Sequence, residues 1–202
     1  GPTAARVFTL VDSGLSFDAA ARQVHIETGE QTAGCNPAHR SAPLAMMPDL
    51  NSEQLADCAV KEAALTHHHP LSGDVAAAVV TICHELVRGS AWETAIESAR
   101  AGRLPETQAA MMNPELNALN RGGFASDVLA AAVHFVGSST AFDAALDGSL
   151  EFAGPDNYCP VLVGSVGGAK WGVSSISHRM LGHCDILPRA RSVAKNLASG
   201  WK

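Results

Sequence analysis

The feature that most constrains this chain is a run of glycines in an apolar segment near its C-terminal end. Gly164, Gly168 and Gly172 recur every four residues, so a helix through them places all three on one face. Glycine on a helix face costs stability unless another backbone packs closely there. The spacing therefore predicts a buried helix in a tightly packed helical core. The turn before it places Asp156 at the helix N-terminus, where a carboxylate serves either as a metal ligand or as an ordinary helix cap.

Most of the remaining chain also has helical spacing of apolar residues, with Ser, Asn, Gly and Pro at the segment ends. The expected helices are residues 17–28, 52–66, 73–88, 124–136 and 188–198. A further helix is opened by a capping box of Ser90 and Glu93, and a short amphipathic one starts at Ser138 or Ser139. The stretch 75–83 marks a central helix, and Ile186, Val193 and Leu197 are the expected core contacts of the last helix. No segment alternates with a period of two. We therefore predict an all-α fold, a compact orthogonal multi-helix bundle forming a single domain over residues 1–202.

Composition narrows the possible functions. The formal net charge is −6 and no run of Lys and Arg occurs, which argues against nucleic acid and against an anionic membrane surface as partners. No apolar run reaches the ~18 residues of a membrane span, and we expect no secretion leader. The 5 cysteines have no CxxC spacing, which is typical of reduced, mostly buried thiols in a cytoplasmic protein.

Candidate binding residues stand in segment 34–43, which is rich in proline and small residues and is expected to be irregular. Asn36, His39 and Arg40 lie there, and functional residues concentrate in such loops. The guanidinium of Arg40 has the forked geometry that binds a phosphate or a carboxylate. Pairing of Arg40 with a structural acid is an equally good interpretation.

Thr66 and the three histidines that follow it end one of the expected helices. Successive helical residues point about 100° apart, so His67, His68 and His69 cannot all reach one metal ion from a regular helix. We expect one of them to line a cleft and the others to cap the helix C-terminus, where a cation is favoured.

Two further segments carry weaker signals. Gly122 and Gly123 precede a helix, but without the full glycine pattern of a phosphate-binding loop. Asp127 falls in the first turn of that helix, where capping is its expected role. Cys159 precedes a proline, and we expect it to pack rather than to act as a nucleophile.

Four stretches of the sequence, taken in order, are each similar to a motif of one protein family. Residues 35–44 are similar to an Asn-Gly…Met-Arg…Ala-Pro loop, 65–67 to a Thr-His turn, 122–132 to a Gly-Tyr…Asp-Thr-Leu…Ala helix, and 154–172 to a Gly-Gly-Asp-x-Asp-Thr metal loop with its Gly-rich helix. Taken together, over essentially the whole chain, they resemble the ADP-ribosylglycohydrolase family, which includes the dinitrogenase-reductase-activating glycohydrolases.

The resemblance implies an all-α bundle that uses a pair of Mg²⁺ or Mn²⁺ ions to hydrolyse the glycosidic bond between ADP-ribose and its acceptor. It implies Asp156 as a metal ligand, with Asn157 as a weaker candidate. It leaves the catalytic residues unassigned. The substrate-binding candidates are Asn36, His39, Arg40, Thr66, His67, Gly122, Gly123 and Tyr158.

Two departures from the family pattern leave alternatives open. The metal loop is one residue short, and Tyr158 stands where a second Asp is expected. The sequence contains no Thr-Asp-Asp, the family's N-terminal metal motif, so the chain resembles the C-terminal two-thirds of the fold. A separate N-terminal chain or a homo-oligomer are therefore possible partners besides the ribosyl substrate. The alternative functions are a non-catalytic protein that binds ADP-ribose, and a subunit that needs a second chain for activity.

Overall fold

The computed structural model describes residues 1–112, 114–155 and 157–200. The α-helices of these residues are α1 (Pro2–Asp12), α2 (Phe17–Glu27), α3 (Asn36–Ser41), α4 (Ser52–Ala64), α5 (Pro70–Val87), α6 (Trp92–Arg100), α7 (Pro105–Ala110), α8 (Ala125–Ser138), α9 (Phe142–Phe152), α10 (Cys159–Trp171), α11 (His178–Leu181) and α12 (Leu187–Ala198). The short 3₁₀ helices are η1 (Ala42–Met46), η2 (Leu116–Ala118) and η3 (Val173–Ser175). The described residues include no β-strand, and Gly34 and Phe124 form an isolated bridge. The predicted all-α class is confirmed.

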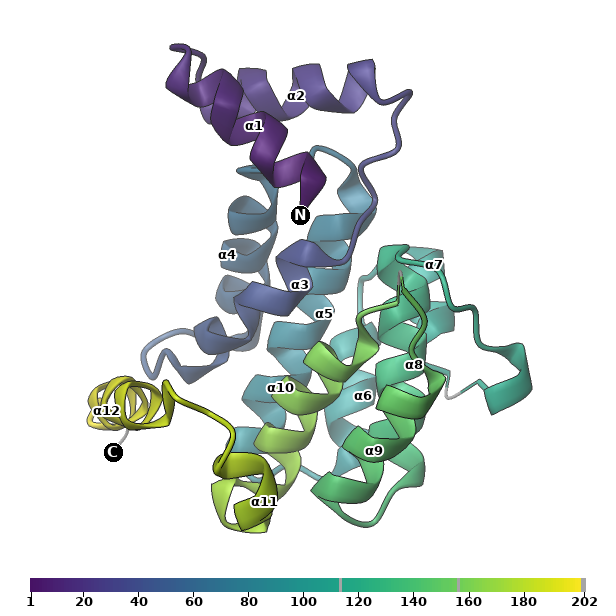
Figure 1. The fold of residues 1–202 in the computed structure, drawn as a ribbon, viewed down its shortest axis with the longest axis vertical. Coiled ribbons are helices and arrows are strands. Elements are labelled where there is room, and N and C mark those ends of the chain that lie inside the picture. Colours follow the sequence, from purple (N-terminus) through teal and green to yellow (C-terminus); the bar gives the residue numbers. More distant parts are fainter. Residues whose placement is uncertain (113, 156, 201–202) are drawn as a thin grey trace.

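Helix α5 is the centre of the bundle. Of its 18 residues 14 are buried, and α3, α4, α6 and α10 pack around it (Figure 1). Its length and composition would allow it to cross a membrane, but 78% of its apolar window is buried inside the protein, as in the core helix of a globular fold. The predicted central helix is confirmed, and it begins earlier than expected. Pro70 fits the first turn, and His69 Nδ1 accepts a hydrogen bond of 3.2 Å from the Leu71 amide.

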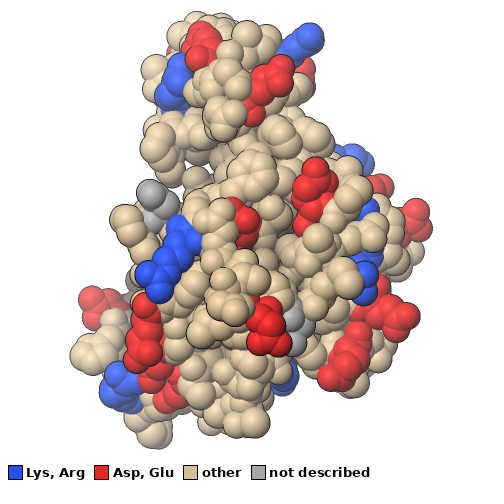
Figure 2. All heavy atoms as spheres, turned by 90° about the vertical axis from the view of Figure 1, so that its right-hand side faces the viewer, with Lys and Arg blue, Asp and Glu red and all other residues tan. Residues whose placement is uncertain are grey.

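Helices α1 and α2 form a hairpin that stands at one end of the bundle. Figure 1 shows it above the body, and Figure 2 shows it as a knob on a narrower neck. The hairpin has its own apolar cluster, built on Val7, Ala20, Ala21 and Val24, separate from the main core. Ser16 caps α2, because its Oγ accepts a hydrogen bond of 3.2 Å from the Ala19 amide.

The glycine-rich segment forms α10, but the predicted close packing of the glycine stripe is wrong. A Cβ on Gly164 or Gly168 would meet nothing within 4 Å. The tight position is Gly167, where a Cβ would lie 3.1 Å from the Trp171 ring and 3.3 Å from the Phe142 ring of α9. The face that packs against α9 is therefore offset from the stripe. Gly172 ends the helix with φ +75°, a conformation that favours glycine.

Two local expectations are corrected. Residues 36–46 are not irregular but form α3 and η1, because Pro37 and Pro43 each fall in a first helical turn, where a missing amide proton costs nothing. The capping box at Ser90 is wrong, because α6 has no side-chain cap. Ser90 Oγ instead donates a hydrogen bond of 2.8 Å to Glu85, a carboxylate at the end of α5.

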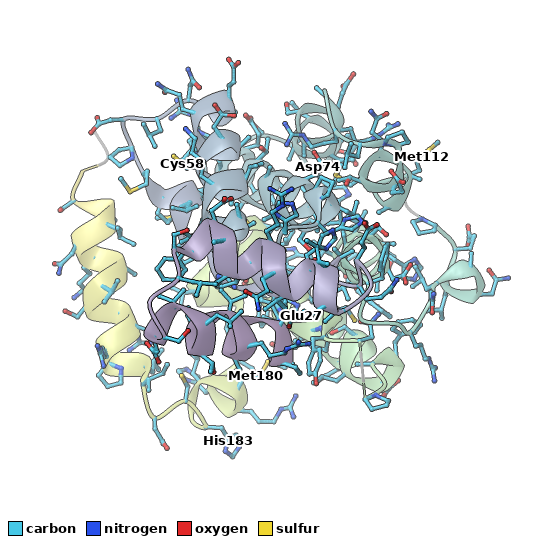
Figure 3. The ribbon with its side chains drawn as sticks, turned by 90° about the horizontal axis from the view of Figure 1, so that it is seen from above. Glu27, Cys58, Asp74, Met112, Met180 and His183 are labelled. Atoms are coloured by element: carbon cyan, nitrogen blue, oxygen red, sulfur yellow. The ribbon has the colours of Figure 1, made fainter. Side chains whose placement is uncertain are left out.

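The expected core contacts of the last helix are also wrong. Helix α12 has no buried residue, and Ile186 and Val193 are 69% and 52% exposed. Figures 1 and 3 show α12 at the edge of the molecule. Its apolar face turns toward Pro43 and Met46 and leaves an apolar groove of about 520 Å³. The amphipathic spacing predicted the helix but did not indicate how deeply its apolar side chains are buried.

Candidate functional site

Helices α3, α8 and α10 all begin around one cleft of about 340 Å³. Its lining residues are Gly34, Cys35, Asn36, His39, Gly122, Gly123, Val128 and Tyr158. Five of the eight substrate-binding candidates are among them: Asn36, His39, Gly122, Gly123 and Tyr158. Segments up to about 120 residues apart in the sequence thus meet at this cleft.

Backbone pairing holds the first two of these segments together. The Ala125 amide donates a hydrogen bond of 2.9 Å to the Ala33 carbonyl, beside the Gly34–Phe124 bridge. Ser72, on buried α5, donates through Oγ to the carbonyl of Gly34 at 2.9 Å. These contacts hold the entry to α3 against the entry to α8, beside the cleft.

His39 and Tyr158 form an aromatic corner of the cleft. Their ring centroids are 6.2 Å apart and the planes cross at 75°, an edge-to-face arrangement. Burial lowers the pKa of His39 to about 4, so its imidazole is neutral at pH 7. The Nε2 atom of His39 is buried and has no hydrogen-bond partner among the residues that the structure describes. Tyr158 is 56% exposed, so one side of its ring is open to a ligand.

Asn157 links the loop that contains Gly122 and Gly123, here called the glycine loop, to the start of α10. It is 1% exposed, and its Nδ2 donates to the carbonyls of Asn120 at 3.1 Å and Gly122 at 3.2 Å. Its Oδ1 accepts a hydrogen bond of 2.9 Å from the Cys159 amide. These contacts support a structural role for the carboxamide, and metal binding by Asn157 stays a prediction.

Asp156, the principal predicted metal ligand, lies outside the described residues. Among the residues that the structure does describe, no group of three or more His, Cys, Asp or Glu side chains is placed to hold a metal ion. The described side chains that line the cleft supply imidazole, thiol, phenol and carboxamide groups, and none of these described side chains is a carboxylate. Hard cations such as Mg²⁺ prefer carboxylate oxygens. The described donors therefore do not by themselves fit such an ion.

Arg40 pairs with a structural acid. Its Nε donates to Glu62 at 2.6 Å, and its Nη2 donates to Thr66 Oγ1 at 2.8 Å. The Thr66 hydroxyl lies 2.8 Å from Nδ1 of buried His67. Thr66 Oγ1 thus accepts a hydrogen bond from Arg40 and shares a second one with His67 Nδ1, whose direction follows from the tautomer of His67. Arg40, Thr66 and His67 are thus joined by hydrogen bonds, and none of the three is among the residues that line the cleft.

The histidines after Thr66 have separate roles. Burial, reinforced by Arg40 and by the N-terminal amino group, lowers the pKa of His67 to about 4. His69 caps the N-terminus of α5 rather than the end of α4, which corrects the expected C-terminal capping. His68 and His69 also contact the ring of His25 in α2, at centroid distances of 5.1 and 6.0 Å. The contacts link the hairpin to the body.

Sequence reasoning missed Gly34, Cys35 and Val128 as lining residues, although the first two directly precede the predicted Asn36. Burial raises the pKa of the Cys159 thiol to about 12 and raises that of Cys35 as well. Both thiols are therefore protonated at neutral pH and unsuited to nucleophilic attack. This agrees with the expectation that Cys159 packs.

Asp127 does not cap α8, because Phe124 is the N-cap residue and no side-chain cap is made. Burial raises the pKa of Asp127, whose carboxylate lies next to Gly122.

A larger cavity of about 520 Å³ lies elsewhere, between α6 and α8, where it is lined by Trp92 and Arg100. It contains none of the predicted residues. The smaller cleft is thus the better candidate on chemistry, although not on size.

Comparisons with known proteins agree with the family resemblance and with the all-α fold. The sequence model of the ADP-ribosylglycohydrolase family matches residues 1–201. A solved structure described as an ADP-ribosylglycohydrolase-related protein complex is similar, with a TM-score of 0.74 and 22% sequence identity. The match covers 95% of this chain and 70% of that chain, and at this identity it shows a shared fold. A search of the curated proteins found no match.

Proposed function

The chain belongs to the ADP-ribosylglycohydrolase family, and we propose that it hydrolyses the glycosidic bond between a ribosyl group, as in ADP-ribose, and its acceptor. The observation that carries the proposal is the cleft where α3, α8 and α10 begin. Residues 36, 39, 122, 123 and 158, selected from sequence for substrate binding, line this one cavity.

The chain's own residues supply binding groups for such a substrate. The carboxamide of Asn36 and the neutral imidazole of His39 can exchange hydrogen bonds with sugar hydroxyls. The exposed ring of Tyr158 supplies a flat wall beside the sugar. In the reaction, the bond from the ribose anomeric carbon to the acceptor breaks, a water oxygen takes its place, and the acceptor receives a proton. No described side chain is assigned the catalytic role.

Metal dependence is the part of the proposal that rests on sequence. Mg²⁺ or Mn²⁺ would be held through Asp156, which lies outside the described residues, with Asn157 as the second candidate. The ion would polarise the substrate and position water. The described donors do not fit a hard cation by themselves.

The test is a release assay on arginine- and serine-ADP-ribosylated peptides, with Mn²⁺, with Mg²⁺ and with a chelator. We expect free ADP-ribose from the wild-type chain with metal and less than a tenth of that rate from Tyr158→Ala. His183→Ala is the matched control, since His183 is exposed and lies outside the cleft. The hydrolase proposal fails if no substrate is cleaved under any metal condition, or if Tyr158→Ala cleaves at the wild-type rate.

A non-catalytic ADP-ribose-binding protein is the second candidate. The specific observation in its favour is that Tyr158 occupies a position where the family motif has an acid, and none of the described side chains that line the cleft is a carboxylate. Calorimetric binding of ADP-ribose that is unchanged by chelator, without turnover, would favour this candidate. A separate N-terminal chain, homo-oligomerisation and a cytoplasmic location stay predictions.

A further inference from the structure

We propose that contacts among the rings of His25, His68 and His69, here called the histidine clasp, hold the α1–α2 hairpin to the body, and that acidification opens the clasp and frees the hairpin. The opening is expected between about pH 5 and 6.5, where histidine side chains take up protons. The inference is independent of the proposed function, because it involves no ligand and none of the described residues that line the cleft.

The hairpin is a unit that can separate from the body. It has its own apolar cluster, built on residues such as Val7 and Val24, and no residue of α1 or α2 belongs to the main core among the described residues. Figures 1 and 2 show the hairpin as a knob at one end of the bundle. In the segment after α2, Gly29 and Glu30 have φ +62° and +66°, and this left-handed conformation is uncommon for a glutamate. Apolar packing therefore contributes little to holding the hairpin in place.

The histidine clasp lies where α2 meets the turn between α4 and α5. The centroid of the His25 ring is 5.1 Å from that of His68 and 6.0 Å from that of His69. The His25 ring is also held from its own side, because its Nδ1 shares a hydrogen bond of 2.7 Å with Thr32 Oγ1. The Thr32 carbonyl in turn accepts a hydrogen bond of 3.0 Å from Ser72 Oγ on α5. The clasp thus joins the hairpin to the central helix.

His69 makes its contacts only as a neutral side chain. Its Nδ1 accepts the hydrogen bond of 3.2 Å from the Leu71 amide that caps α5. A protonated imidazole carries a hydrogen on both nitrogens, so protonation removes this acceptor and leaves two N–H groups facing each other. It also places a positive charge at the N-terminus of α5, where the helix dipole favours an anion. Acidification therefore opposes the position that His69 has in the clasp.

His25 responds to acid in the same direction. Burial and, next, the charge of His68 lower the pKa of His25, the charge of His69 adds to this, and Glu30 opposes it. The released hairpin therefore takes up a proton on His25 more readily than the docked hairpin does. Docking is thus fully favoured above about pH 6.5 and is weakened as the pH falls. Protonated rings at the distances of the clasp also repel one another.

The other charged groups near the clasp do not reverse this sign. Glu27, on the same helix as His25, is paired with Arg6 of α1 at 2.7 Å. On the body side, Arg40 and the N-terminal amino group add positive charge beside His67. Burial, together with these two charges, lowers the pKa of His67 to about 4, so His67 stays neutral while the clasp opens.

The test is ¹⁵N relaxation of the full chain at pH 7.5 and at pH 5.5, which reports whether two parts of a protein tumble together. The apparent rotational correlation time of the amides in α1 and α2 is compared with that of the amides in α5. We expect the two values to agree within about a tenth at pH 7.5, and the hairpin value to be lower by about a third or more at pH 5.5. Because the signals are those of the folded molecule, a general loss of stability in acid does not produce this difference.

Three variants assign the effect to the clasp. His69→Asn keeps an N-cap acceptor that cannot be protonated, and we expect it to lower the midpoint of release by at least about half a pH unit. His25→Ala removes the ring that both other histidines contact, and we expect release already at pH 7.5. His183→Asn is the matched control, because His183 is exposed and follows α11 at the other end of the molecule (Figure 1), and we expect the wild-type response. Amide spectra verify that each variant is folded.

Several results would overturn the inference. They are equal correlation times at both pH values in the wild type, a hairpin that tumbles separately at pH 7.5, a wild-type midpoint in His69→Asn, or a docked hairpin in His25→Ala at pH 7.5. An altered midpoint in His183→Asn would also count against it. None of these measurements uses a substrate, so the hydrolase proposal stands or fails separately.

Discussion

Replacing Asn157 with alanine tests how the cleft is held together. The carboxamide makes three hydrogen bonds, of 3.1, 3.2 and 2.9 Å, in a position that is 1% exposed. A buried hydrogen bond contributes a net ~1 kcal/mol, so we expect Asn157→Ala to lower the free energy of unfolding by about 3 kcal/mol. For a chain of this length that corresponds to a fall of roughly 6–12 °C in the melting temperature.

The assay is urea unfolding followed by circular dichroism, together with a thermal melt. Asn117→Ala is the matched control, because Asn117 is exposed in η2, and we expect it to stay within about 0.5 kcal/mol of wild type. Asn157→Asp keeps the shape but turns an oxygen toward two carbonyls, so we expect it to destabilise at least as much at pH 7. A loss below about 1 kcal/mol in Asn157→Ala would refute the pinning of the glycine loop to α10.

Two further predictions concern stability. The pKa values of His39 and His67 are lowered to about 4, so the unfolded chain takes up protons first as the pH falls below about 6.5. Stability should therefore be full above that pH and lower by about 1–3 kcal/mol at pH 5.5, in denaturant midpoints measured against pH; a flat profile would contradict the neutral histidines. Alanine at Gly164 or Gly168 should stabilise by about 0.5–1 kcal/mol, because a Cβ there meets nothing within 4 Å, whereas Gly167→Leu should destabilise against the Trp171 and Phe142 rings. Thermal melts would contradict this if all three changes had the same sign.

The fold class and several helix ends could be predicted from sequence, because local chemistry determines them. The apolar run of α5 can only be a buried helix, and Ser16 and Asn51 cap α2 and α4 through their own side chains. The close packing predicted for the glycine stripe of α10 was wrong, because it depends on tertiary contacts and not on local chemistry. Which face of α10 is crowded depends on how α9 lies against it, and sequence spacing does not specify that contact.

The site was partly predictable in the same sense. Polar residues in segment 36–40 and glycines before α8 indicated a functional loop, and the cleft brings these segments together. Pairing of Arg40 with an acid was one of two interpretations, but which acid was not predictable, because Glu62 lies 22 residues away on α4. The unpaired state of His39 Nε2 also depends on tertiary packing, and no sequence signal marks it.

In the proposed function, this cleft receives the ribose. A crystal of the chain soaked with ADP-ribose tests that claim directly. We predict ribose density between His39, Tyr158 and the Gly122–Gly123 loop. Ribose density in the cavity lined by Trp92 and Arg100, or an empty cleft at saturating ligand, would contradict it.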